Sequence, residues 1–217
     1  MSSEKKSGIL NIDNANMKAA LAVGAHPDDI EVGCAGTLMV LKDRGYEIFG
    51  IVATQGDIGG DKTLRRSEAL SAWNVMGFEK KNLLFLNYSD GFVKDDAKLV
   101  GKIRRLVQQI RPEFVFTTSS GDIHQDHRYI CNAVKSACGY KVPKLLEFPL
   151  NSIDDSNFFV DIKSKHKEKI KAIECHRSQI EKGSISLESM DLVSRLKAFK
   201  CSREYVEGFK IVKYLFS

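Results

Sequence analysis

One short cluster of an imidazole and two carboxylates follows directly after an apolar stretch. His26, Asp28 and Asp29 come within four positions of one another, immediately after residues 19–23. A buried strand normally ends in neutral turn residues, because carboxylates beside a core are costly unless a metal or another cation neutralises them. In an open α/β sheet, ligands bind at the carboxyl ends of the strands. The residue types and their position therefore predict a site here.

A second cluster repeats this arrangement about 100 residues further along the chain. The apolar stretch 113–118 leads into a polar loop that holds His124, Asp126 and His127. Together, the two clusters contain three of the five histidines of the chain. Two strand ends that carry the same residue types predict one composite site.

The residue types favour a catalytic metal centre. Catalytic zinc takes three protein ligands, often histidine with a carboxylate, and keeps a fourth position for water. His26, Asp29 and His127 would make such a set. Asp28 and His124 would then be free to handle protons beside the metal, which is how hydrolytic zinc sites divide the work.

Two other interpretations compete with a metal site. Asp28 or Asp29 could simply cap a helix that begins near Glu31. A nucleotide-binding protein is the second interpretation, since Gly33 and Gly36 lie near a helix start. The dinucleotide fingerprint needs glycines immediately after the strand, however, and here that space holds carboxylates, which would repel a pyrophosphate.

Strand and helix patterns alternate along the chain, which predicts an α/β fold with a mainly parallel sheet flanked by helices, in a Rossmann-like three-layer sandwich. The expected strands cover residues 18–24, 47–53, 82–87, 113–118 and 144–148, with a closing strand at 205–213. The expected helices cover 32–44, 62–76 and 95–110, each followed by a glycine or proline stop signal, with two more after residue 158.

A few other residues carry weaker signals. The glycine-rich loop 56–61 is either part of a substrate lid or an ordinary connector. Trp73 has helical spacing with apolar neighbours and is expected in the core. His166 lies among lysines on a helix expected to be exposed, and His176 is expected in a polar cluster at a helix end, so neither belongs to the ligand set.

Composition is that of one ordinary globular domain. The chain has 217 residues and 43% hydrophobic content, and we expect one domain over 18–217 behind a flexible extension over 1–17. The extension lacks an apolar core of signal-peptide length, and no stretch approaches the roughly 20 apolar residues of a membrane span, so a cytoplasmic location is expected. The net charge of +5 is mild. Its basic residues, such as those in 163–171, predict a solvated face rather than a groove for nucleic acid or an anionic substrate.

The cysteines give no sign of a disulfide framework or a cysteine zinc site. There are five, an odd number, and none forms a Cys-x-x-Cys pair. We expect them to be reduced and mostly buried.

The two clusters also resemble the motifs of a known family. Ala25-His26-Pro27-Asp28-Asp29, followed by Gly33, Gly36 and Thr37, resembles the opening motif of the LmbE-like or PIG-L family of zinc-dependent N-acetylglucosaminyl deacetylases. His124-Gln125-Asp126-His127 resembles its second motif. Weaker matches extend the resemblance over nearly the whole chain after about residue 17, at Arg65 with Glu68, Asp90-Gly91, 171–179 and 205–209.

The resemblance implies a hydrolase that removes an N-acetyl group from an N-acetylglucosamine-type conjugate by attack of zinc-bound water. Zinc, or another divalent metal, would be held by His26, Asp29 and His127. Asp28 would be the general base. Relatives of this type often assemble from several copies, so a homo-oligomer is a further expectation. The alternatives are a hydrolase of another small-molecule amide and a non-catalytic sugar-binding member.

The remaining roles also follow from the resemblance alone. His124 would be the electrophilic or general-acid partner, and Asp126 would orient it. Arg65 and Asp90 match positions that contact substrate. Many members have Glu directly after the second Asp of the opening motif, and here Ile30 intervenes, so no role is carried over to Glu31.

Overall fold

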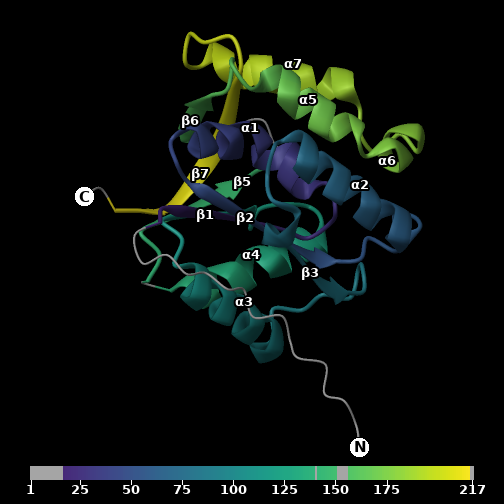
Figure 1. Cartoon of the computed structure of the whole chain (residues 1–217), viewed down its shortest axis with the longest axis vertical. Coiled ribbons are helices and arrows are strands. Elements are labelled where there is room, and N and C mark those ends of the chain that lie inside the picture. The colour runs from purple at the N-terminus through teal and green to yellow at the C-terminus, as the bar shows by residue number, and fades with distance from the viewer. Residues whose placement is uncertain (1–16, 140, 151–155, 216–217) are drawn as a thin grey trace, which may run out of the picture.

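A seven-stranded mixed sheet forms the centre of the protein (Figure 1). The computed structural model describes residues 17–139, 141–150 and 156–215, so the predicted extension over 1–17 lies outside this part except for Met17. The strand order is β3-β2-β1-β4-β5-β7-β6. The first five strands of the chain pair in parallel, and β7 pairs antiparallel with both β5 and β6.

The strands and helices alternate through most of the described chain. The strands are β1 (Ala19–Gly24), β2 (Glu47–Thr54), β3 (Leu83–Tyr88), β4 (Phe114–Thr118), β5 (Lys144–Phe148), β6 (Phe158–Asp161) and β7 (Val206–Tyr214). The helices are α1 (Asp29–Asp43), α2 (Lys62–Val75), α3 (Ala97–Ile110), α4 (Gln125–Cys138), α5 (His166–Glu174), α6 (Arg177–Glu181) and α7 (Leu187–Phe199), with a short 3-10 helix at Lys80–Asn82.

Helices cover both faces of the sheet. In Figure 1, α3 and α4 lie on one face and α1 and α2 on the other, while α5 and α7 form an outer layer over α1. Each face has its own apolar core, one around Trp73 and Phe116 and the other around Leu21, Ile103 and Val115. The predicted α/β sandwich is confirmed, with α5 to α7 as an additional layer on one side.

The strand order reverses at β1, and this places the two polar clusters side by side. β1 pairs with β2 on one side and with β4 on the other, with Val23 opposite Thr117. Parallel neighbours end at the same edge of the sheet, so the loops after β1 and β4 open next to each other. Such a switch point is where α/β sheets bind ligands.

The predicted strands are found within a residue or two. One helix start differs, and the structure contains one further strand. Helix α1 begins at Asp29, three residues earlier than expected, since the Asp29 carboxylate turns back to accept hydrogen bonds from the amides of Ala25 and His26. Strand β6 was not predicted. It is four residues long and pairs with β7 at the edge of the sheet, so its sequence carries little periodicity.

Two expectations about the helix after β6 were wrong. His166 is buried, stacks on the Tyr205 ring at 3.7 Å and bonds to Asp191 Oδ1 at 2.8 Å. Lys169 is also buried and pairs with Glu207 Oε1 at 2.6 Å. Helix α5 packs against α1, α2 and α7, so only part of its surface remains for solvent.

The expectations for Trp73 and the cysteines hold in the described chain. Trp73 is fully buried, and all five cysteines are free, with Cys34, Cys131 and Cys138 buried and the other two partly so.

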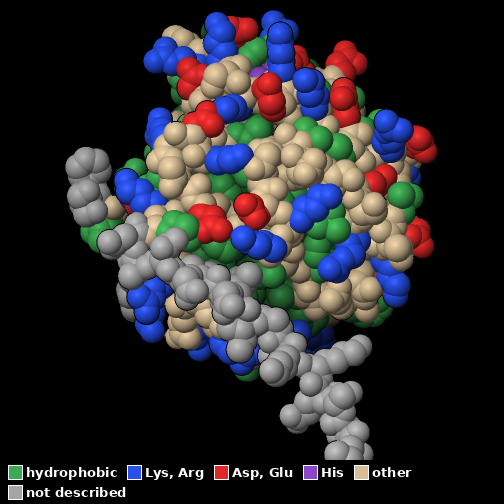
Figure 2. All heavy atoms as spheres, viewed as in Figure 1, with side chains coloured by type: hydrophobic (Ala, Val, Ile, Leu, Met, Phe, Trp, Pro, Cys, Tyr) green, Lys and Arg blue, Asp and Glu red, His purple; other side chains and the backbone are tan. Residues whose placement is uncertain are grey.

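Lys and Arg side chains are interspersed with Asp and Glu over the face in Figure 2. None of the described helices is long and apolar enough to span a membrane.

Candidate active site

The loop after β1 delivers His26 and Asp29 to the carboxyl edge of the sheet. Asp29 Oδ2 accepts the amides of Ala25 at 2.7 Å and His26 at 2.9 Å, so one carboxylate oxygen is committed to the backbone. The other oxygen, Oδ1, lies 3.3 Å from His127 Nε2. The local fold of the His-Pro-Asp-Asp segment therefore fixes the orientation of Asp29.

The start of α4 delivers His124, Asp126 and His127. His124 is the N-cap residue, and its Nδ1 accepts the Asp126 amide at 3.2 Å. Asp126 and His127 lie in the first turn, and the hydroxyl of Thr118 at the end of β4 donates to the His127 carbonyl at 2.8 Å. Strand and helix are thus joined directly beside the site.

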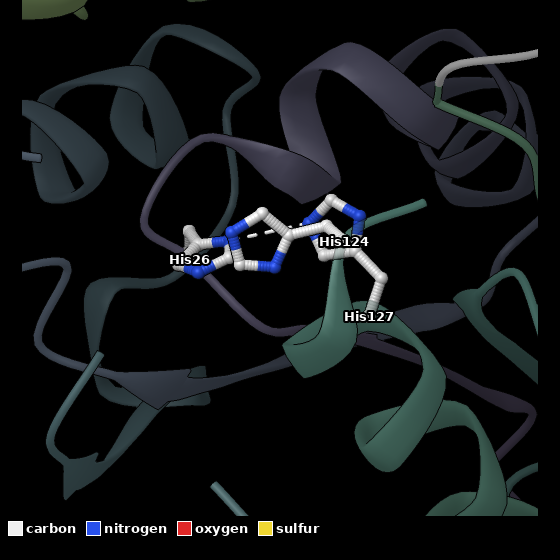
Figure 3. A group of neighbouring side chains, drawn as sticks. All are labelled: His26, His124 and His127. Carbon is white, nitrogen blue, oxygen red and sulfur yellow. Dashed lines mark hydrogen bonds between the residues drawn. The ribbon is translucent and has the colours of Figure 1, made fainter. Parts of the chain in front are cut away.

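The two clusters converge. His26 Nδ1 lies 3.2 Å from His127 Nε2 and 3.6 Å from Asp29 Oδ2. Figure 3 shows the imidazole of His26 facing those of His124 and His127, which come from the start of α4. The ring centroids of His26 and His124 are 4.6 Å apart. The structure thus brings His26, His124 and His127 together, which the sequence alone could not show.

A carboxylate lies against the outer nitrogen of each facing imidazole. Asp90 Oδ1 is 3.0 Å from His26 Nε2, and Asp122 Oδ2 is 3.1 Å from His127 Nδ1. A carboxylate on the outer nitrogen fixes the proton there and turns the lone pair of the inner nitrogen outward, as in metal-binding histidines. Here both inner nitrogens point at one spot, where two lone pairs repel unless a cation lies between them.

These donors fit a tetrahedral divalent ion such as zinc. With ligands at about 2.0–2.2 Å, a tetrahedral ion holds its ligand atoms roughly 3.3–3.6 Å apart. His26 Nδ1 and His127 Nε2 are 3.2 Å apart, and Asp29 faces them with different oxygens, Oδ2 at 3.6 Å from His26 Nδ1 and Oδ1 at 3.3 Å from His127 Nε2. Two overlapping groups also have donor atoms within 4.8 Å of one another, namely His26 with His124 and His127, and His26 with Asp90 and Asp126.

The electrostatics of the described residues also favour a positive charge at this place. Burial by itself lowers the pKa of His26, yet the charge of Asp29 and bonds to neighbouring carboxylates raise it well above its usual value. For His127, burial is likewise outweighed by Asp29 and Asp122, and its pKa is raised to about 9. The pKa of Asp29 is held well below its usual value by His127 and His26, which outweigh its own burial.

Asp28 forms an ion pair with Arg65. Its Oδ2 accepts a hydrogen bond from Arg65 Nη2 at 3.1 Å, and Arg65 Nη1 donates to the Gly56 carbonyl at 2.8 Å. Arg65 therefore links α2, the loop 56–61 and the His-Pro-Asp-Asp segment. The sequence predicted a substrate contact for Arg65, and the structure adds its bond to Asp28.

The contacts of Asp126 differ from the expected one. Its Oδ2 accepts the Gly91 amide at 2.7 Å and lies 3.6 Å from His26 Nε2, while it is the backbone amide of Asp126 that bonds to His124. A neutral His124 whose Nδ1 accepts that amide carries its proton on Nε2. Burial and the charges of His26 and His127 lower the pKa of His124, which favours this neutral form.

Comparison with known proteins agrees with this geometry. The model of the family described as "PIG-L: GlcNAc-PI de-N-acetylase" matches residues 21–138, which contain both clusters. The chain belongs to the PIG-L family.

Relatives support the membership in the PIG-L family over most of the chain. The "Uncharacterized deacetylase YaiS" of Escherichia coli (strain K12) is 31% identical over 70% of this chain and 91% of its own length. The diacetylchitobiose deacetylase of Thermococcus kodakarensis is 23% identical over 93% of this chain and 85% of its own. The crystal structure of the conserved protein TT1542 from Thermus thermophilus superposes with a TM-score of 0.83 at 25% identity, covering 93% of this chain and 97% of that one.

Sequence reasoning missed two features of this PIG-L site. Asp122 was not singled out, although it lies two residues before His124 in the same loop, and that proximity was an available signal. His176 was left out, yet it is fully buried, with Nε2 3.6 Å from Glu31 Oε2. Glu31 and Asp28 raise the pKa of His176 against the opposing effect of burial. Its partner comes from α1, which is distant in sequence, although the family resemblance over 171–179 was an available signal for a position near the site.

Proposed function

We propose that this PIG-L member is a metal-dependent deacetylase that hydrolyses the N-acetyl group of an N-acetylglucosamine-type conjugate. The observation that carries the proposal is the 3.2 Å separation of His26 Nδ1 and His127 Nε2, each with a carboxylate on its outer nitrogen. The names of the relatives, among them a diacetylchitobiose deacetylase, support an N-acetylated sugar as the substrate.

In this proposal, His26, Asp29 and His127 hold a zinc ion. When bound, such an ion polarises a carbonyl oxygen and lowers the pKa of water to about 7. Asp90 and Asp122 keep the two imidazoles in the tautomer that this requires, through their contacts with the outer nitrogens.

Asp28 acts as the general base and takes the proton of the water that attacks the amide carbon. Its carboxylate is oriented by Arg65, which supports a fixed direction of proton transfer. The nitrogen of the tetrahedral intermediate must be protonated before the bond to the acetyl carbon breaks. Asp28 holds a proton at that stage and can return it, so the products are acetate and a free amine.

His124 donates a hydrogen bond from Nε2 to the oxyanion of the tetrahedral intermediate. This assignment is supported by its neutral tautomer, with Nδ1 engaged by the Asp126 amide, and by its exposed position facing His26. A donor aimed at a developing oxyanion typically contributes on the order of 100 to 1,000 fold in rate.

The test is acetate release from N-acetylglucosamine and N,N'-diacetylchitobiose by the purified protein, after chelation and after zinc is restored. We expect turnover that depends on zinc and is lost in Asp28→Asn, with zinc still bound stoichiometrically. The matched carboxylate-to-amide control is Glu79→Gln, because the Glu79 side chain is exposed and its carboxylate pairs with the equally exposed Lys81, away from the site.

Two results would overturn the proposal. Stoichiometric zinc without turnover of any N-acetylated sugar would point to another small-molecule amide or to a binding protein. Failure to bind zinc at all would remove the metal site itself.

A further inference from the structure

Three large apolar side chains are exposed on the loops that surround the site. The exposed fractions are 66% for Ile58, 75% for Phe92 and 84% for Ile123. They come from the loops after β2, β3 and β4 respectively. Side chains of this size gain free energy when they are buried, so three of them exposed on loops beside one site indicate a ligand that covers them.

Each of these residues adjoins a residue that belongs to the site. Ile58 follows Asp57, which accepts the Asp90 amide at 2.9 Å, and Asp90 in turn contacts His26. Ile123 precedes His124, whose ring faces His26. The loops that carry these side chains therefore hold groups of the site or bond directly to them.

The loops are joined to one another at Gly91, the residue before Phe92. The Gly91 carbonyl accepts Gln125 Nε2 at 2.6 Å, and its amide donates to Asp126 at 2.7 Å. A Cβ added at Gly91 would lie 2.9 Å from Ile58 Cδ1, so Ile58 lies directly against this residue. With φ at +75°, Gly91 also has a backbone conformation that disfavours other residues. The three apolar side chains thus stand on one connected framework.

The polar groups next to these side chains are engaged within the loops. Asp57 bonds to the Asp90 amide, and Asp122 accepts the His124 amide at 2.8 Å. Arg128 donates to the carbonyls of Asp122 at 2.8 Å and Ile123 at 2.6 Å. The polar groups directly beside Ile58 and Ile123 are therefore bonded within the loops.

We propose that Ile58, Phe92 and Ile123 form an apolar rim, and that the substrate carries an alkyl or aryl aglycone which packs against it. The inference rests on the proposed deacetylation, and it adds the chemical class of the group attached to the sugar. The loops that carry the rim hold Asp90 and His124 or bond to them, so an aglycone on the reacting sugar lies within reach of the rim. Leu192 and Phe199, which are also exposed, lie on α7, a different element from the loops that carry the site residues.

The test compares N-acetylglucosamine with its methyl, butyl and hexyl glycosides, all below their micelle concentrations and with zinc present. We expect kcat/KM for acetate release to rise with chain length, reaching at least tenfold for the hexyl glycoside over the free sugar. This advantage should fall to within about twofold in the triple variant Ile58→Ser, Phe92→Ser, Ile123→Ser. The matched control, Leu192→Ser with Phe199→Ser, should keep the full advantage.

The outcomes separate this inference from the proposed function. No acetate from any of the sugars would refute the deacetylase itself. Equal kcat/KM for all chain lengths, with clear turnover, would refute only the aglycone. Light scattering supplies an independent readout: a wild-type oligomer that dissociates in the triple variant while the chain-length ratio persists would make the rim an interface between copies and overturn the proposal.

Discussion

Arg65 Nη2 donates to Asp28 Oδ2 over 3.1 Å, in a pair whose side chains are only 4% and 14% exposed. The same guanidinium donates from Nη1 to the Gly56 carbonyl. One planar group thus aims the carboxylate that we propose as the general base and anchors the loop beside it. Lysine has no fork that could make both contacts in these directions.

Arg65→Lys should therefore lower kcat by about tenfold or more, because a misdirected Asp28 transfers its proton less efficiently. Zinc stoichiometry should stay at the wild-type value. Steady-state kinetics and metal analysis check both expectations. Arg66→Lys is the matched control, since Arg66 lies over the Phe85 ring at 3.9 Å and contacts no group of the site in the described structure. An unchanged kcat in Arg65→Lys would contradict the positioning role.

Asp122→Asn should weaken zinc binding by roughly 10 to 100 fold, as is typical for a carboxylate behind a metal-binding histidine. The amide keeps the shape of the side chain but loses the charge that faces His127 Nδ1 at 3.1 Å. Competition with a chromogenic chelator measures the affinity. Wild-type affinity in this variant would mean that His127 does not depend on Asp122.

His124→Ala should reduce kcat by on the order of 100 to 1,000 fold while zinc remains bound, since the variant loses the proposed oxyanion donor but keeps His26, Asp29 and His127. Zinc content and acetate release from the same preparation separate the two effects. Loss of zinc together with activity would instead place His124 in the ligand set, as the His26-His124-His127 group would allow.

Zinc binding at pH 7 should release at least one proton. In the zinc-free protein, His127 is protonated at neutral pH. Burial lowers its pKa, but Asp29 and Asp122 outweigh burial and raise the pKa to about 9. Ligands must be deprotonated to bind a metal, so the apparent zinc affinity should rise with pH up to about pH 9 and then level off. Calorimetry in two buffers of different ionisation enthalpy counts the protons. An affinity that is constant from pH 6.5 to 9 would speak against this linkage.

Lys197→Met should stabilise the protein at pH 7. Burial is the main cause that lowers the pKa of Lys197 to about 8, with nearby Lys169 adding to it. The unfolded chain binds more protons than the folded one between about pH 8 and the ordinary lysine pKa near 10.4, so wild-type stability should rise with pH through this window. Lys197→Met removes the cost of burying the charged ammonium, which is on the order of 1–3 kcal/mol. The free energy of unfolding should then depend less on pH between about pH 8 and 10.

Urea unfolding at pH 7 and pH 10 measures the effect of Lys197→Met, with Lys200→Met as the control on an exposed lysine of the same segment. A variant less stable than wild type at pH 7 would show that the Lys197 ammonium is stabilised in the fold.

The elements that position the site were predictable because their signals are local. Apolar runs of five to seven residues predicted β1 and β4. The His and Asp residues that follow each run predicted that the clusters lie at the ends of these strands. The order of the strands, which makes these two ends neighbours, was not predicted. His26, Asp29 and His127 were grouped because their residue types suit a zinc site.

Partners that are distant in sequence, or bonded through the backbone, could not be predicted in the same way. Asp90 meets His26 from 64 residues away, and Arg65 meets Asp28 from 37. His166 and Lys169 looked solvated because lysines surround them, yet helix packing buries both.

The sequence by itself determined the α/β alternation and the two His/Asp clusters, since periodicity and strand-end position are properties of consecutive residues. Only the structure decided which nitrogen of each imidazole faces inward, since Asp90 from the loop after β3 and Asp122 from the loop before α4 lie against the outer nitrogens. It also decided that the loops after β2, β3 and β4 contact one another around Gly91, because separate loops become neighbours only when the parallel strands align their ends.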